Sequence, residues 1–194
     1  MSGQKTVTPS ATSLAEAVKA TKSRGLPPVE QWNPPFCGDI DMEIQRDGTW
    51  FYEGTPIGRP GMVKLFASIL IREDENYFLV TPVEKVGIRV QDAPFVAVDF
   101  ETSGAGTTQR LTFTTNLDDV TVAGPDAPLR FVRDANTGEP SPYVSVRRNL
   151  EALIDRKSFY RLVDIGVHYD GWFGVWSDGE FFRIIPSVEL PQEG

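Results

Sequence analysis

The chain has 194 residues, of which 40% are hydrophobic and 11% aromatic, and its formal net charge is −8 at pH 7. This composition is typical of a globular protein with one large domain or two small ones. The negative charge argues against nucleic acid and anionic membrane surfaces as partners, because the average field repels polyanions. The single cysteine and single histidine exclude an intramolecular disulfide and a structural zinc site of Cys and His ligands.

The longest apolar run, from Leu65 to Ile71, is too short to span a bilayer. The first residues lack the apolar core of a signal peptide. We therefore expect a cytoplasmic protein that is not embedded in a membrane. No motif for a nucleotide or another cofactor is recognised, so we expect no cofactor.

Residues 1–36 are expected to form an N-terminal tail, a helix and a proline-rich connector. Ser13 and Glu16 have the spacing of a capping box, which predicts the start of this helix. Its apolar stripe, Leu14 and Val18, is thin. We therefore expect the helix to lie on the surface rather than in a core.

Residues 37–92 are predicted to form a first α+β unit. Apolar and acidic residues alternate from Asp39 to Ile44, which predicts a half-buried strand. Asp47-Gly48 is a strong signal for a hairpin turn into an aromatic-rich return strand. Pro60 is expected at the first position of a helix with a buried apolar face. Two further strands are predicted over 77–81 and 83–90.

Residues 93–194 are predicted to form a β-rich segment and then a second α+β unit. Leu150, Leu153 and Ile154 follow helical spacing, which predicts a helix over 147–156. Strands are predicted over 95–101, 109–115, 120–122, 129–133, 142–146 and 159–165, and a final hairpin over 172–176 and 181–185.

The order of elements around the two predicted helices is similar when Arg59 is placed on Arg147. This similarity suggests that the two halves share a topology. We therefore predict an α+β fold of two small domains with related motifs of β-hairpin, helix and antiparallel sheet. The N-terminal helix precedes them.

Four motifs stand out: Cys37-Gly-Asp-Ile-Asp41, Asp47-Gly-Thr-Trp-Phe-Tyr52, Leu79-Val-Thr-Pro-Val-Glu-Lys85 and Asp92-Ala-Pro-Phe95. Together they resemble an uncharacterised proteobacterial family, domain of unknown function 1285, over nearly the whole chain. The resemblance implies a two-domain fold with repeated structural motifs and a link to signal transduction. It implies no catalytic residue, because none is established for the family.

Asp39, Asp41 and Glu43 place three carboxylates on one face of a predicted strand. Carboxylate oxygens suit Mg²⁺ or Ca²⁺, so Asp39 and Asp41 are the candidate metal ligands. Strand residues two positions apart are too distant to chelate an ion unaided. The simpler interpretation is the solvated face of a half-buried strand.

Arg59, Arg147 and Arg148 lie at the starts of the two predicted helices. A basic side chain opposes the helix dipole there, unless an anion is bound by the guanidinium and the free amide groups. These arginines are therefore candidates for binding a small anionic ligand. An ion pair with a nearby acid is the alternative.

Glu84, Lys85 and Trp172 complete the candidate ligand residues. Glu84 and Lys85 point to opposite faces of a regular strand, and the alternative interpretation is a turn with surface charges. Trp172 belongs to an aromatic-rich set that would either line a groove between domains or fill the core. His168 and Cys37 lack the partner residues of a catalytic site.

We therefore predict a non-enzymatic binding or sensing module of bacterial signal transduction. It would hold a small anionic ligand or a signalling protein between its two domains. The alternatives are a carboxylate- or metal-dependent enzyme centred on Asp39, Asp41 and Glu84, and a purely structural protein-interaction domain.

Overall fold

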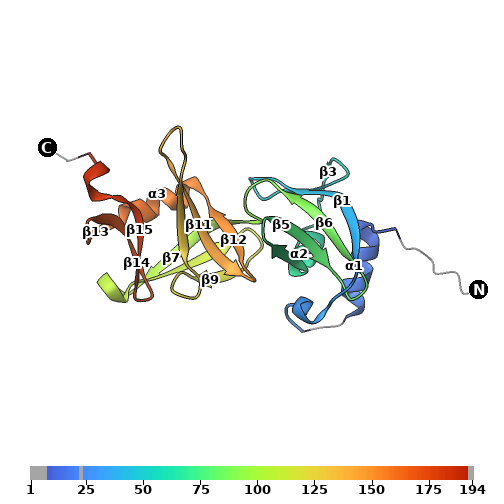
Figure 1. Ribbon diagram of the computed structural model, residues 1–194. Helices are drawn as coiled ribbons and strands as arrows, with labels where there is room; N and C mark the ends of the chain where they lie inside the picture. The colour runs from blue at the N-terminus through green and yellow to red at the C-terminus, as the bar shows by residue number, and fades with distance from the viewer. Residues whose placement is uncertain (1–7, 22–23, 192–194) are drawn as a thin grey trace, which may run out of the picture. The chain divides into compact units, whose positions relative to one another are not determined.

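The computed structural model describes residues 8–21 and 24–191, and the first seven residues of the predicted tail lie outside this description. The chain divides into two compact units, Met1–Asp92 and Ala93–Gly194. Each unit contains helices and a six-stranded sheet with one parallel strand pair (Figure 1). The fold is therefore α+β with two related domains. Among the described residues, no helix is long and apolar enough to cross a membrane.

The sheet of the first unit has the strand order β3-β2-β1-β6-β5-β4. Its central neighbours β1 and β6 are parallel, and its other pairs are antiparallel. The predicted Asp47-Gly48 turn joins β1 to β2, and Gly48 has a φ of 89°, a value that favours glycine. The strands are β1 (Phe36–Ile44), β2 (Trp50–Tyr52), β3 (Thr55–Pro56), β4 (Leu70–Glu73), β5 (Asn76–Val80) and β6 (Lys85–Val90).

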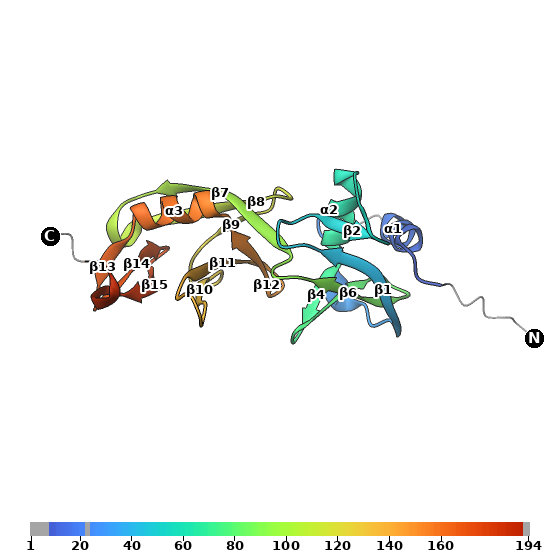
Figure 2. The ribbon, with the colours of Figure 1, turned by 90° about the horizontal axis from the view of Figure 1, so that it is seen from above.

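Helix α2 (Pro60–Ser68) covers one face of this sheet and begins with Pro60, as the sequence predicts (Figure 2). Its Phe66 stacks on Trp50 of β2 with ring centroids 6.4 Å apart, and both side chains are buried. Large buried side chains thus fill the space between α2 and the sheet. The short 3₁₀-helix η1 (Val29–Gln31) precedes β1.

Helix α1 (Ala11–Ala20) lies on the same side of the sheet as α2 (Figure 2). The helix lies at the surface with Glu16 and Lys19 exposed, as predicted, but Leu14 and Val18 on its other face are buried in the core. Its capping box is formed by Ser10 and Ser13 rather than by Ser13 and Glu16. A thin apolar stripe suffices here because the sheet and α2 together enclose it.

The second unit contains a six-stranded sheet of order β10-β11-β12-β7-β8-β9 and a three-stranded sheet of order β13-β14-β15. Strands β7 and β12 are parallel neighbours. The elements are β7 (Phe95–Ser103), η2 (Gly106–Thr108), β8 (Arg110–Thr115), β9 (Val120–Val122), β10 (Leu129–Arg133), β11 (Pro140–Arg147), β12 (Leu150–Ile154), α3 (Arg156–Asp164), β13 (Val167–Tyr169), β14 (Trp172–Ser177), β15 (Glu180–Pro186) and η3 (Ser187–Glu189).

The two six-stranded sheets have the same topology. In each sheet, two three-stranded meanders pair through a parallel contact between the first strand of one and the last strand of the other. Strands β1 to β6 thus correspond to β7 to β12. Helix α2 connects the meanders of the first unit, whereas α3 follows the last strand of the second sheet. This correspondence differs from the predicted one, in which Arg59 was placed on Arg147.

The helix predicted over 147–156 is wrong, because these residues complete the hairpin of β11 and β12. Arg148 and Asn149 form its two-residue turn with φ values of 49° and 54°. Burial alternates along Leu150–Ile154, with Leu150, Ala152 and Ile154 inward. The small Ala152 hides this period of two, whereas the larger residues Leu150, Leu153 and Ile154 match a helical period.

The strand predicted over 159–165 is also wrong, because α3 spans most of it. Asp155 is the N-cap, and its side chain accepts a hydrogen bond of 2.8 Å from the backbone N–H of Ser158. Ser158 and Leu162, four positions apart, are the buried residues of the helix. The cap and this spacing were the signals in the sequence for a helix at this position.

Candidate functional site

A hollow of about 490 Å³ lies on the sheet of the first unit, over strands β1, β5 and β6. Lys85 and Arg89 line it, whereas Val86 and Ile88 between them are buried in the core. Because successive strand residues face opposite sides, this hollow opens on the face away from the core. We call it the sheet-face pocket, and the side chains on this face that line it are Phe36, Asp39, Phe78, Lys85 and Arg89.

Asp39 and Gly87 lie opposite each other at the parallel contact between β1 and β6. A β-carbon on Gly87 would lie 2.0 Å from Oδ1 of Asp39, so the glycine leaves the space that this carboxylate occupies. Within the described part of the chain, the Asp39 side chain has no hydrogen bond and no ion pair. The pocket therefore contains one carboxylate without a protein partner.

The two basic side chains of the pocket are held by acids. Lys85 Nζ lies 2.7 Å from both carboxylate oxygens of Glu73. Arg89 donates to Asp41 over 2.7 Å and to Glu43 over 3.3 Å. The hydrogen bond to Asp41, and to a smaller extent the one to Glu43, raises the pKa of Arg89. Two of the three carboxylates predicted on this strand face therefore pair with a cation instead of chelating a metal.

Aromatic rings form the remaining walls of the pocket. Phe36 meets Phe78 edge to face with ring centroids 5.9 Å apart, and Phe36 is 57% exposed. The ammonium group of Lys85 lies 4.4 Å from the centroid of Phe78. Cys37 is exposed beside Phe36, and its thiol donates to the carbonyl of Pro35 over 3.4 Å.

Glu84 and Lys85 point to opposite sides of the first unit. Lys85 lines the pocket, whereas Glu84 is buried at 4% exposure and accepts a hydrogen bond of 3.3 Å from Ser13 of α1. Burial raises the pKa of Glu84, and the Ser13 hydroxyl opposes this effect. Thr81 Oγ1 accepts the backbone N–H of Glu84 over 3.1 Å and fixes this turn. Glu84 is therefore a buried group and not a surface charge.

The predicted carboxylate centre is not assembled. Asp39 and Asp41 belong to the outer face of β1, whereas Glu84 faces α1. Over residues 8–21 and 24–191, no group of three or more His, Cys, Asp or Glu side chains is placed to hold a metal ion.

The candidate arginines belong to different units. Arg59 is exposed at the N-cap of α2 and makes no side-chain capping hydrogen bond. Arg147 and Arg148 lie at the β11–β12 hairpin, so their predicted place at a helix start is wrong. Arg147 lies 4.9 Å from the ring centroid of Phe95 and 3.8 Å from Asp119. Burial lowers the pKa of Arg147, and Asp119 opposes this shift.

Trp172 and His168 lie in the three-stranded sheet of the second unit. Trp172 is half-buried, and the guanidinium of Arg183 lies 5.2 Å from its ring centroid. His168 is exposed, with Nδ1 2.8 Å from the hydroxyl oxygen of Ser187. Neither side chain lines the sheet-face pocket.

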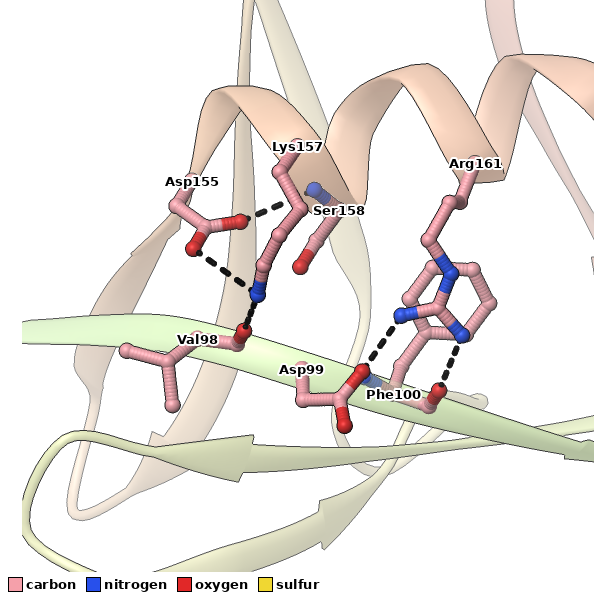
Figure 3. Close-up of polar contacts among 7 residues, drawn as sticks. All are labelled: Val98, Asp99, Phe100, Asp155, Lys157, Ser158 and Arg161. Atoms are coloured by element: carbon pink, nitrogen blue, oxygen red, sulfur yellow. Dashed lines mark hydrogen bonds and ion pairs between the residues drawn. The ribbon is translucent and has the colours of Figure 1, made fainter.

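A cluster of charged residues joins α3 to β7 in the second unit (Figure 3). Arg161 pairs with Asp99 and donates to the carbonyl of Phe100 over 2.9 Å. Its guanidinium lies 4.5 Å from the ring centroid of Phe100. The hydrogen bond from Arg161 is the main reason that the pKa of Asp99 is lowered. These contacts hold the helix against the strand.

Lys157 makes a second contact in the same cluster (Figure 3). It donates to the carbonyl of Val98 and lies 3.5 Å from Asp155. A register shift in the pairing of β7 with β8 lies at Val98, between Ala97 and Asp99. The charged groups of this cluster are thus partnered within the protein, by contacts that join α3 to β7.

Phe36, Gly87 and Arg89 are pocket residues that the sequence analysis missed. They come from β1 and β6, which are distant in the sequence and meet only through parallel pairing. The one signal in the sequence was the alternation of Lys85, Gly87 and Arg89 along a strand. This pattern places them on one face but does not reveal the neighbouring strand.

Comparison with known proteins places the whole two-unit architecture in one family. Residues 27–93 match the model described as domain of unknown function (DUF1285), N-terminal domain, and residues 94–184 match the DUF1285 C-terminal domain. The crystal structure of a DUF1285 family protein from Silicibacter pomeroyi DSS-3 is 63% identical. The match covers 91% of this chain and 97% of that chain, with a TM-score of 0.85.

A second DUF1285 family protein, from Shewanella baltica OS155, is 32% identical. That match covers 63% of this chain and 90% of the other, with a TM-score of 0.51. No curated protein matches the chain.

Proposed function

We propose that this chain, which belongs to the DUF1285 family, is a non-enzymatic binding module whose ligand site is the sheet-face pocket of its N-terminal unit. The observation that carries the proposal is a hollow of about 490 Å³ with aromatic walls and charged side chains. Sites for small molecules have this size and this mixture of apolar walls and a few polar groups.

The paired cations of the pocket support binding rather than chemistry. Lys85 is fixed by Glu73, and Arg89 is fixed by Asp41 and Glu43. Such pairs hold the walls in place before a ligand arrives, which lowers the entropic cost of binding. In the signalling role that the family resemblance implies, ligand occupancy of this pocket would be the sensed event.

The proposal differs in one respect from the expectation based on sequence. That expectation placed an anionic ligand at Arg59, Arg147 and Arg148. Of these, Arg147 contacts Phe95 and Asp119 in its own unit. None of the three lines the sheet-face pocket. The pocket residue shared by both proposals is Lys85.

The proposal is tested by mapping small-molecule binding with backbone amide NMR shifts. A library of cationic, anionic and neutral compounds is titrated into the full chain, and saturable shifts are expected on β1, β5 and β6. Phe36→Ala should weaken this binding, because an exposed wall ring is removed without loss of core packing. Tyr160→Ala, which removes a ring that is 60% exposed on α3, is the matched control and should not change it.

Two results would contradict the proposal. One is a library in which no compound shifts the pocket amides. The other is binding that Phe36→Ala and Tyr160→Ala affect equally, since the effect would then not belong to the pocket.

A further inference from the structure

We infer that the ligand of the sheet-face pocket is a small organic cation whose ammonium or guanidinium group is held by the carboxylate of Asp39. This inference rests on the proposed function and names the chemical class of its ligand. The sequence predicted an anionic ligand, whereas this inference assigns a cationic one.

The distribution of charge around the pocket is the first argument. Lys85 is already neutralised by Glu73, and Arg89 is shared by Asp41 and Glu43. Asp39 is the carboxylate left over, since no side chain of residues 8–21 or 24–191 pairs with it. An anionic ligand would have to compete with these acids for the two cations, whereas a cation finds an open partner.

The position of Asp39 is the second argument. Its carboxylate lies over Gly87, with Oδ1 2.0 Å from the place where a β-carbon would be. Gly87 is paired with Asp39 in the parallel contact and with Phe78 of β5 in the antiparallel one. The absence of a side chain at Gly87 therefore leaves space for the Asp39 carboxylate, which lines the hollow and is exposed to solvent.

The aromatic walls are the third argument. The face of an aromatic ring attracts a cation, and the effect is larger where water is partly excluded. Lys85 shows this geometry already, with its ammonium 4.4 Å from the centroid of Phe78. The ring of Phe36 stands beside Phe78 and is 57% exposed. A bound ammonium at Asp39 would thus meet a carboxylate and a partly exposed ring in one hollow.

The size of the hollow selects the occupant. A hollow of about 490 Å³ has room for a small molecule. A carboxylate and aromatic rings together form a recognition set for ammonium compounds. We therefore assign the pocket to a free organic amine or guanidine rather than to a charged side chain of a partner protein.

The test uses two probes of similar shape and opposite charge, phenethylammonium and 3-phenylpropionate. Each is titrated into the full ¹⁵N-labelled chain at constant ionic strength. Phenethylammonium is expected to shift amides of β1, β5 and β6 in a saturable manner, whereas 3-phenylpropionate should not. Asp39→Asn should weaken phenethylammonium binding by about tenfold or more, because a hydrogen-bonded charge is lost.

Two further variants separate position from net charge. Gly87→Ala keeps every charge but forces the Asp39 carboxylate to move, and only Asp39 atoms lie near the new β-carbon. It should weaken phenethylammonium binding as Asp39→Asn does. Glu16→Gln removes one negative charge from the exposed face of α1 in the same unit and should leave binding unchanged.

The possible results test separately the charge of the ligand, the role of Asp39, the kind of ligand and the pocket itself. Binding of 3-phenylpropionate at the pocket without phenethylammonium would overturn the cation inference and support the pocket. Unchanged phenethylammonium binding in both Asp39→Asn and Gly87→Ala would overturn the role of Asp39. If a peptide rich in lysine and arginine binds there and phenethylammonium does not, the assignment to a small molecule is wrong. No shift at the pocket with any probe or library compound would overturn both the inference and the proposed function.

Discussion

The hydroxyl of Ser13 donates a hydrogen bond to the carboxylate of Glu84 over 3.3 Å and joins residues 71 positions apart. Ser13 belongs to the first turn of α1, and Glu84 to the turn between β5 and β6. Glu84 is 4% exposed, so little water is available to solvate the charge of its carboxylate. This contact fixes the N-terminal helix to the sheet, and its strength depends on the protonation of one carboxyl group.

Glu84→Gln is expected to stabilise the protein near neutral pH and not in acid. Burial raises the pKa of Glu84, so the folded state holds this proton more tightly than the unfolded state. The resulting stability is fully present below the unfolded pKa and is lost as the pH rises through the folded pKa. The variant should therefore be more stable relative to wild type at about pH 7.5 than at about pH 3.5, which lies below the unfolded pKa.

Urea denaturation of both proteins at the two pH values measures this difference. The comparison between variant and wild type is needed because other groups titrate with opposite sign. Asp47 and Asp134 have lowered pKa values caused by hydrogen bonds from backbone N–H groups. A wild-type-minus-variant difference that does not change with pH would contradict the prediction.

Ser13→Ala is expected to loosen α1. The variant loses the hydrogen bond to Glu84 and the capping contact in which the Ser13 hydroxyl accepts the backbone N–H of Ser10 over 2.9 Å. Loss of a cap and of a buried polar contact should cost about 1 kcal/mol or more of the free energy of unfolding. Faster amide hydrogen exchange in α1 would show the loosening.

Thr12→Ala is the matched control for Ser13→Ala, because Thr12 is exposed on the same turn. It should change hydrogen exchange little. Equal effects of the two variants would mean that the Ser13–Glu84 contact does not hold the helix.

Two buried serines of the second unit are expected to respond oppositely to alanine. Ser158 and Ser177 are both fully buried. The Ser158 hydroxyl has no hydrogen-bond partner among the described residues. Ser177 accepts the backbone N–H of Leu111 over 2.9 Å and donates to the carbonyl of Ala123 over 2.6 Å.

Ser158→Ala should therefore raise the free energy of unfolding by about 1 kcal/mol, since an unsatisfied hydroxyl leaves the core. Ser177→Ala should lower it by about 2 kcal/mol, because it leaves two backbone groups without partners. Chemical denaturation of each variant measures both values. Destabilisation of similar size in the two variants would refute this distinction.

Asp155→Ala is expected to cost about 1 kcal/mol, because it removes the N-cap hydrogen bond of α3. Asp155→Asn keeps a side-chain oxygen for this bond and should retain most of the stability. In the ion pair of Asp155 with Lys157 the Lys157 side chain is 64% exposed, so this pair contributes little. If Asp155→Asn were as unstable as Asp155→Ala, charge rather than capping would explain the effect.

The prediction of the fold was accurate where local signals were strong. Asp47-Gly48 predicted the first hairpin, and Pro60 predicted the start of α2. It failed at 147–165, where strand and helix were exchanged. Leu150, Leu153 and Ile154 fit a helical period by size alone, but Arg148 and Asn149 adopt left-handed conformations that turn the chain into a hairpin.

The candidate site was predicted only in part. Lys85 and Asp39 were singled out as charged residues, and both line the sheet-face pocket. Their neighbours Gly87 and Arg89 were not, because neither has chemistry that stands out in a sequence. These residues could not be predicted as a site, because cross-strand neighbours determine whether a charged side chain is paired or free.

The α+β class, the turns and most strands could be predicted because they depend on local periodicity and on turn residues with special backbone angles. Which strands became neighbours could not be predicted, because it depends on contacts between distant parts of the chain. The parallel pairing of β1 with β6 sets Asp39 over Gly87 and Arg89 against Asp41 and Glu43. That pairing leaves one carboxylate open in the pocket, because long-range contacts and not local sequence decide how charges are matched.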